Sequence, residues 1–209
     1  NKAPSDAWLD ALGGGTRIGG DKVFVAEACE FSGSFLHMKP TIAVVLNIDA
    51  DHLDYYGDMA HIEAAFYNFC SLLPMDGLAI GWGEDPRVRA LFARLDRRHE
   101  TFGYTKVCDW YPADLTYSDH GCPRFTACFR GRPMCSVALR VAGRFNILNA
   151  LAALAAALNT STSGTEMELD DSSMQLIIQQ DESSNYTVET LPELKIAYHT
   201  YGELNAARD

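Results

Sequence analysis

The stretch TIAVVLNIDADHLD, Thr41 to Asp54, joins an apolar run directly to a cluster of acidic residues and one histidine. Its first part, Thr41 to Ile48, is typical of a strand buried on both faces of a parallel sheet. Lys22 to Ala28 (KVFVAEA) has the same character and leads into a second acidic cluster. The carboxyl ends of neighbouring parallel strands meet at one edge of the sheet, where open α/β sheets bind ligands. We therefore expect the two acidic clusters to lie together.

A carboxylate and an imidazole at that edge can hold a divalent cation beside phosphate oxygens. We expect Glu27 and His52 to be the metal ligands, because they stand where the two strands end. The alternative is an exposed loop of acids ahead of the next helix, with Asp51 or Asp54 accepting backbone N–H bonds. The residue types leave both interpretations open.

Helices and strands are predicted to alternate through the rest of the first three-quarters of the chain. A 3.6-residue apolar rhythm and proline at a first turn indicate helices, and short apolar runs indicate strands. Alternating runs separated by turn residues indicate antiparallel hairpins. The predicted helices are Met59 to Leu73, Asp85 to Leu95 and Arg144 to Leu158, the strands Gly77 to Trp82 and Thr101 to Tyr104, and the hairpins Cys108 to Val141. This order predicts an α/β fold, a mostly parallel sheet flanked by helices with an antiparallel β extension.

The last of these helices carries two amides that could contact a base. Asn146 and Asn149 are three residues apart and share a face near the helix start. An amide side chain offers both a donor and an acceptor, as an adenine edge requires. The alternative is ordinary polarity in a first helical turn.

Composition excludes several classes of protein. Residues 1–158 carry 18 acidic and 15 basic side chains, whereas residues 159–209 carry 10 and 2, so the acidity belongs to the tail. This balance argues against nucleic acid as a partner. The sequence has no apolar run of membrane-spanning length and no signal-peptide pattern, so we expect a cytoplasmic protein without a membrane partner. The six cysteines form no C-x-x-C pair and are expected to be reduced.

Three stretches bear on domain organisation. Gly13 to Lys22 (GGGTRIGGDK) fails as a phosphate loop, which needs G-x-x-x-x-G-K followed by Ser or Thr, and no other stretch fits. We expect a domain over residues 1–158 without that loop, an acidic polar linker over 159–173 and a short β segment over 174–209. The β segment should contain strands near Gln175 to Gln180, Tyr186 to Glu189 and Leu194 to Thr200.

Three motifs together carry a resemblance. They are VAEACEFSGSFLHMKPTIAVVLNIDADHLDYYGD (Val25 to Asp58), EDPRVRAL (Glu84 to Leu91) and GRFNILNALAALAAA (Gly143 to Ala157). In their order and spacing they resemble the central, ATP-binding domain of the Mur ligase family, over about residues 8–158. The resemblance is strongest to the branch of the family that joins L-alanine to UDP-N-acetylmuramate in peptidoglycan precursor synthesis.

The resemblance implies a set of roles for the matching positions. Glu27 and His52 would be ligands of Mg²⁺, and Asn47 and Asp51 would line the site around metal and substrate. Adenine of ATP would be contacted by Asn146 and Asn149, with Arg144 close by. Members of the family phosphorylate a carboxylate with ATP, and an amino acid then attacks the acyl phosphate.

The chain also departs from that pattern. The phosphate loop of the family is not found, so we expect a fragment that is inactive by itself. Phe145 stands where many relatives have His, which puts part of the nucleotide contact in doubt. Leu191 to Asp209 instead resembles the first strands of homoserine O-acetyltransferase, although no G-x-S-x-G elbow is present. A non-catalytic chimeric or engineered protein is the alternative, and the oligomeric state is left open.

Overall fold

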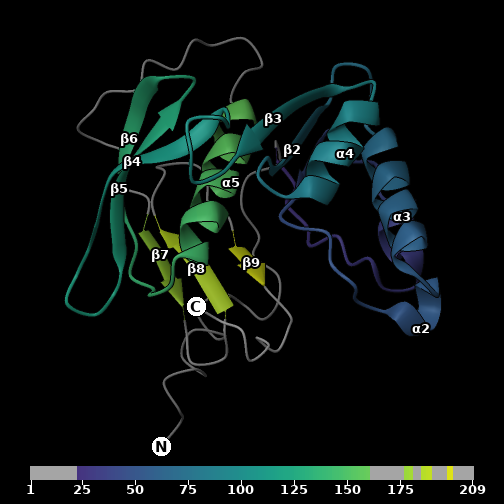
Figure 1. Cartoon of the computed structure of the whole chain (residues 1–209), viewed down its shortest axis with the longest axis horizontal. Helices are drawn as coiled ribbons and strands as arrows, with labels where there is room; N and C mark the ends of the chain where they lie inside the picture. Colours follow the sequence, from purple (N-terminus) through teal and green to yellow (C-terminus); the bar gives the residue numbers. More distant parts are fainter. Residues whose placement is uncertain (1–22, 161–176, 181–184, 190–196, 200–209) are drawn as a thin grey trace, which may run out of the picture.

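The computed structural model describes residues 23–160, 177–180, 185–189 and 197–199, with side chains described for 23–160. Within this part a six-stranded sheet has the order β1-β2-β3-β4-β5-β6. Figure 1 shows α5 on one face of this sheet and α3 and α4 on the other. The arrangement confirms the expected α/β fold of a sheet flanked by helices.

The sheet begins with parallel strands and ends with antiparallel ones. Parallel pairing joins β1 to β2, β2 to β3 and β3 to β4, and antiparallel pairing joins β4 to β5 and β5 to β6. The predicted antiparallel extension is therefore confirmed. The strands are Ile42–Val45, Leu78–Trp82, Arg98–Phe102, Trp110–Tyr117, Pro123–Phe129 and Arg132–Ala138.

Local sequence signals start the helices where they were expected. Asp58 accepts a hydrogen bond from the backbone N–H of His61 and caps α3, Met59–Ser71. Asp85 accepts from Arg87 and Val88, with Pro86 in the first turn of α4, Pro86–Arg94. The long helix α5 is Phe145–Thr160, and two short elements, η1 (Phe31–His37) and α2 (Leu53–Tyr56), flank β1.

Alternate residues of the strands divide the core between the two faces. Ala43, Val45 and Ala79 point to the face covered by α3 and α4, whereas Leu78 and Ile80 point to the face covered by α5. Successive side chains of a strand point to opposite faces, so both faces of β2 are buried. This burial on two sides accounts for the continuous apolar run of that strand.

The predicted strand at Lys22 to Ala28 is wrong over the described part of that range. Residues 23–30 have no regular secondary structure, and the side chain of Phe24 is 91% exposed. A strand needs a hydrogen-bonded neighbour, and in the described sheet β1 pairs with β2 alone. Apolar composition favours an extended chain but does not supply the ladder.

The three short strands expected in the tail are confirmed. They are β7 (Ile177–Gln180), β8 (Asn185–Glu189) and β9 (Ala197–His199), and they form an antiparallel sheet of their own. The glycine-rich stretch at Gly13 to Lys22 and the linker beyond Thr160 lie outside the described residues.

Two further observations concern the whole described part. No helix within it is both long and apolar enough to cross a membrane. Free thiols include those of Cys70 and Cys108, and burial raises the pKa of the Cys70 thiol to about 12.

Candidate functional site

Glu30, Asp51 and His52 bring three potential metal ligands together beside the end of β1. The Nε2 atom of His52 lies 3.8 Å from Oε1 of Glu30, and its Nδ1 atom lies 3.8 Å from Oδ1 of Asp51. One ligand atom from each residue falls within 4.8 Å of the other two. Within the described residues this is the group of three that could hold a metal ion. We call it the carboxylate–imidazole cluster.

The spacing between His52 and Glu30 fits a hexacoordinate divalent cation. With bonds of about 2.1 Å, two ligands of an octahedral ion lie about 3.0 Å apart when adjacent and about 4.2 Å apart when opposite. The 3.8 Å between Nε2 of His52 and Oε1 of Glu30 lies in that interval. Asp51 approaches the other ring nitrogen, Nδ1, so its 3.8 Å is not a spacing around the same ion. Carboxylates suit Mg²⁺ and Mn²⁺, and an imidazole shifts the preference toward Mn²⁺ and later metals.

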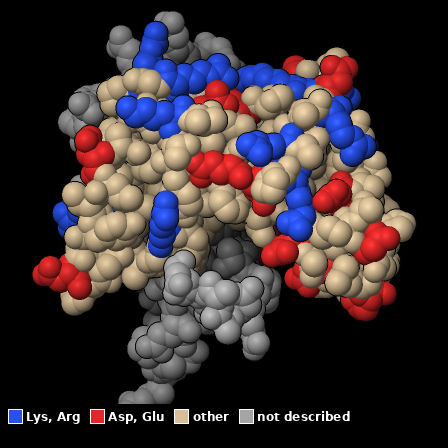
Figure 2. Space-filling view, viewed as in Figure 1, with Lys and Arg blue, Asp and Glu red and all other residues tan. Residues whose placement is uncertain are grey.

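The cluster is open to solvent on one side. The side chains of Glu30 and His52 are each 31% exposed, and that of Asp51 is 66% exposed. Figure 2 shows acidic side chains gathered at the lower right, where Figure 1 places α2 and the start of α3. A cation held here can therefore retain waters or take oxygen ligands from a substrate, as Mg²⁺ does when it bridges protein and phosphate.

The backbone around the cluster adopts conformations that are uncommon for its residues. His52 has a φ of 53°, and Ser32, just beyond Glu30, has a φ of 54°. A non-glycine residue in the left-handed region is strained, and such residues concentrate at functional sites. The backbone N–H of His52 donates to Oδ1 of Asp51 at 2.8 Å, which holds the two ligand residues in one turn.

Aromatic side chains pack around the ligands. The Phe31 ring meets the His52 ring edge-on, with centroids 5.0 Å apart. The Tyr56 hydroxyl donates a hydrogen bond to the backbone carbonyl oxygen of Glu30. Burial, followed by the negative charge of Glu30, raises the pKa of Tyr56 above its ordinary value, so the phenol stays protonated at neutral pH.

Of the residues expected at this site, His52 and Asp51 belong to the cluster, and Asn47 lies exposed on the same connection after β1. Glu27 is exposed, and the carboxylate that meets His52 is that of Glu30. The signal for Glu30 was present, because it belongs to the same acidic cluster three residues later. The alternative for Asp51 is met in part, since its carboxylate accepts the backbone N–H of His52, but no side chain caps α2.

Asn146 and Asn149 share one face of α5, as their spacing predicted. The Nδ2 atom of Asn149 donates to Oδ1 of Asn146 at 3.2 Å, and Nδ2 of Asn146 donates to the carbonyl of Ala142 at 2.8 Å. Asn146 is fully buried, and Asn149 is 8% exposed. The amide of Asn146 thus has a partner at both ends inside the protein.

Arg144 lies just before α5 and stacks on an aromatic ring. Its guanidinium carbon is 4.2 Å from the centroid of Tyr104, and the Tyr104 hydroxyl donates to the Arg144 carbonyl at 3.2 Å. Arg144 is exposed, so its cationic group faces solvent over a flat aromatic surface. Such a pair can accept the face of a base or an anionic group.

The sequence matches the Mur ligase middle domain over residues 18–157. It is 40% identical over 147 residues to the UDP-N-acetylmuramate–L-alanine ligase of Caldanaerobacter subterraneus subsp. tengcongensis, covering 70% of this chain and 32% of that protein. The enzyme of that name from Acetivibrio thermocellus is 43% identical over 149 residues, covering 71% of this chain and 32% of that protein. The chain spans about a third of the length of these curated relatives.

Solved structures share the fold. The UDP-N-acetylmuramate:L-alanyl-gamma-D-glutamyl-meso-diaminopimelate ligase of Neisseria meningitides superposes with a TM-score of 0.53 at 26% identity, covering 61% of this chain and 38% of that one. MurF of Acinetobacter baumannii gives a TM-score of 0.54 at 21% identity, covering 83% and 36%. At that identity the second likeness concerns the fold alone.

Proposed function

This chain belongs to the Mur ligase family through its middle domain, and from that premise we propose that it carries the cation and nucleotide sites of a ligase that joins L-alanine to UDP-N-acetylmuramate. The relatives at about 40% identity support the choice of amino acid and acceptor, because all of those cited carry that name. The convergence of Glu30, Asp51 and His52 is the observation that carries the proposal. A cytoplasmic location goes with it, since UDP-N-acetylmuramate and L-alanine are small polar molecules that dissolve in water.

The carboxylate–imidazole cluster would hold Mg²⁺. The bound ion would supply positive charge beside the phosphoryl group that ATP transfers to the substrate carboxylate. Glu30 and His52 reach the ion from two different segments, while Asp51 is fixed by its bond to the His52 backbone. Asn47, exposed on the connection after β1, would line the substrate side.

The nucleotide base would lie beside the start of α5. Arg144, stacked on Tyr104, presents a cationic plane to solvent. The Nδ2 atom of Asn149 donates to Asn146, and the Oδ1 atom of Asn149 has no hydrogen-bond partner within residues 23–160. That oxygen could accept from the exocyclic amine of adenine, while Asn146 would hold the Asn149 amide in orientation.

The ligand assignment is tested by paired substitutions in the full chain. Glu30→Gln removes the carboxylate charge that lies against His52, so we expect Mn²⁺ affinity to fall at least about tenfold. His52→Ala should do the same. Glu27→Gln, three residues earlier on the same segment, is the matched control and should change the affinity little.

The measurement is a titration of free Mn²⁺ by electron paramagnetic resonance, with circular dichroism to show that each variant is folded. A reversed order, in which Glu27→Gln abolishes binding and Glu30→Gln does not, would return the role to the residue expected from the sequence. Equal affinities for all variants would remove the cation site from this part of the fold.

A further inference from the structure

Tyr56 joins the two segments from which the candidate ligands come. It is the last residue of α2, and its hydroxyl donates to the backbone carbonyl of Glu30, which lies 26 positions earlier in the sequence. The same carbonyl accepts the backbone N–H of Gly33 at 2.9 Å. Both lone pairs of this oxygen are therefore used, one by the turn after Glu30 and one by the phenol.

We propose that Tyr56 is a positioning residue for the carboxylate–imidazole cluster. By holding the Glu30 backbone against α2, it sets how far the Glu30 carboxylate stands from the imidazole of His52. This inference rests on the proposed function, because the distance matters chemically only if the two groups share a cation.

The surrounding backbone shows why a tether is needed. Glu30 precedes Ser32 and Gly33, which have φ values of 54° and 70°, and such a turn is held in place by its tertiary contacts. His52 precedes a helix of a single turn, Leu53–Tyr56. Neither ligand is thus fixed by a long helix or by strand pairing, although metal ligands must be placed to within about 0.2 Å.

Other contacts between these segments are weaker and less directional. The Phe31 ring meets His52 edge-on. The hydroxyl of Tyr55 lies 3.4 Å from where a side chain would begin at Gly33. Within residues 23–160, the bond from Tyr56 to Glu30 is the side-chain hydrogen bond that ties α2 to the Glu30 segment.

A purely structural role for Tyr56 is the competing explanation. The side chain is partly buried and packs against the core cluster formed with α3. Tyr56→Phe separates the two roles, because it keeps the ring and its packing and removes the hydroxyl alone. Tyr55→Phe makes the same change at the adjacent residue, whose ring is 53% exposed, and serves as the matched control.

The experiment measures Mn²⁺ affinity by electron paramagnetic resonance for the full chain and for the Tyr56→Phe, Tyr55→Phe and Glu30→Gln variants. We expect Tyr56→Phe to weaken binding about tenfold, as loss of a supporting group does at metal sites, and Tyr55→Phe to leave it unchanged. Amide hydrogen exchange at Gly33 should be faster in Tyr56→Phe alone, which reports on the tether even if that variant is less stable.

The outcomes distinguish a failure of the positioning role of Tyr56 from a failure of the proposed cation site. If the unsubstituted chain binds Mn²⁺ and Tyr56→Phe binds it equally well, the positioning role is overturned while the cation site stands. Equal weakening by Tyr55→Phe and Tyr56→Phe would also overturn it, since the loss of either hydroxyl beside the Glu30 segment would then have the same effect. If the unsubstituted chain binds no Mn²⁺, the cation site fails, and the positioning role fails with it.

Discussion

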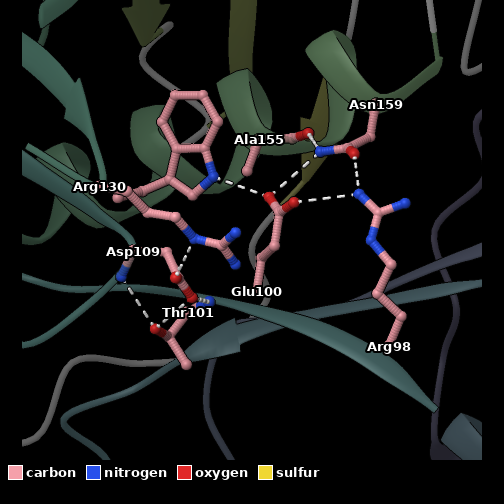
Figure 3. A network of polar contacts seen from close by, with 8 residues as sticks. Arg98, Glu100, Thr101, Asp109, Arg130, Ala155 and Asn159 are labelled. Atoms are coloured by element: carbon pink, nitrogen blue, oxygen red, sulfur yellow. Dashed lines mark hydrogen bonds and ion pairs between the residues drawn. The ribbon is translucent and has the colours of Figure 1, made fainter. Parts of the chain in front are cut away.

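Asp109 shows at the scale of one residue how a carboxylate fixes the start of a strand. It precedes β4, and one of its oxygens accepts from the backbone N–H and the hydroxyl of Thr101 at 2.8 and 3.0 Å. Its other oxygen accepts from Nε of Arg130 at 2.7 Å (Figure 3). β3 and β4 pair at a single position, Phe102 with Trp110, so this carboxylate reinforces a short parallel contact.

The stability supplied by Asp109 should depend on pH. Burial raises the pKa of this carboxyl, but the bonds from Arg130 and Thr101 outweigh burial and hold the pKa below its ordinary value. A lowered pKa in the folded state gives stability that is present above the unfolded pKa, about 3.9, and lost as the pH falls through the folded value. Asp109→Asn should therefore destabilise the protein at pH 7 by about 2 kcal/mol, and the difference should shrink below about pH 4.

Thermal melts of both proteins between pH 3 and pH 8 test this prediction. Asp119→Asn, at an exposed position in the turn between β4 and β5, is the control. A difference for Asp109→Asn that stays constant across the range would show that shape, not charge, accounts for the effect.

Residue types on their own located part of the candidate site. His52 was expected at the site because a buried strand ends in acids and a histidine, whereas Asp51 was placed there by the family resemblance. Choosing Glu30 over Glu27 required the path of the chain. That path turns at Ser32 and Gly33, both with positive φ, and a strand pattern cannot foresee a left-handed serine.

At the scale of elements, α4 packs directly on β2 through a glycine. A side-chain carbon added at Gly81 would lie 2.7 Å from Cζ of Phe92 and 2.7 Å from Cγ1 of Val88. Both neighbours are buried residues of the helix. The close approach of helix and strand at this point leaves no room for a methyl group.

Gly81→Ala should destabilise the fold by about 1–3 kcal/mol, the usual effect of overpacking a core. The prediction is checked by urea unfolding. Phe92→Leu removes the ring atoms that would collide with the new methyl group. The double variant, Gly81→Ala with Phe92→Leu, should therefore lose less stability than the two single variants lose in total. Strict additivity of the two substitutions would contradict the proposed overlap.

A buried carboxylate anchors the far end of α5 to the sheet. Glu100 of β3 is 4% exposed and accepts from Nε1 of Trp110 at 2.9 Å and from Nδ2 of Asn159 at 3.2 Å. Arg98 donates to both Glu100 and Asn159, at 3.2 and 2.8 Å (Figure 3). The helix that carries Asn149 at its start is thus held in place at its end.

Glu100→Gln should destabilise the protein by about 2 kcal/mol, because an amide turns a donor toward groups that themselves donate. Differential scanning calorimetry gives the comparison. Glu63→Gln makes the same change in a solvent-exposed ion pair with Arg87, where little effect is expected. Similar losses for the two variants would show that burial of the network does not matter.

Periodicity predicted most elements because both faces of this sheet are covered. The helices α3 and α4 each have an apolar stripe and a recognisable start, whereas α5 is alanine- and leucine-rich and buried over most of its length. The strand β3 begins at Arg98, three residues before the predicted Thr101. The apolar pattern missed these residues because Arg98 and His99 are polar and exposed and the buried Glu100 is charged. The strand predicted over residues 23–28 was wrong for the opposite reason: these residues are mostly apolar, but they have no neighbouring strand to pair with.

At the scale of the whole molecule, the chain combines the carboxylate–imidazole cluster, proposed to hold a cation, with the Arg144–Tyr104 pair, proposed to meet a base. None of its residues form the G-x-x-x-x-G-K pattern followed by Ser or Thr. Backbone amides and the lysine of such a loop supply most of the contacts to triphosphate. The chain also spans about a third of the length of its relatives.

We therefore predict that this chain binds Mg-ATP more weakly than the micromolar range and forms no amide by itself. Isothermal titration calorimetry measures the first, and product analysis with UDP-N-acetylmuramate and L-alanine the second. Micromolar affinity would show that the cluster and the start of α5 suffice to bind the nucleotide.

Whether one ion contacts both segments is tested most directly by pulsed electron paramagnetic resonance of Mn²⁺ bound to the full chain. A ligand nitrogen couples to the electron spin, so the account predicts a nitrogen signal from bound Mn²⁺ that disappears in His52→Ala. In Glu30→Gln the signal should weaken, because less Mn²⁺ is bound. Bound Mn²⁺ without nitrogen coupling, or with coupling that persists in His52→Ala, would contradict the account.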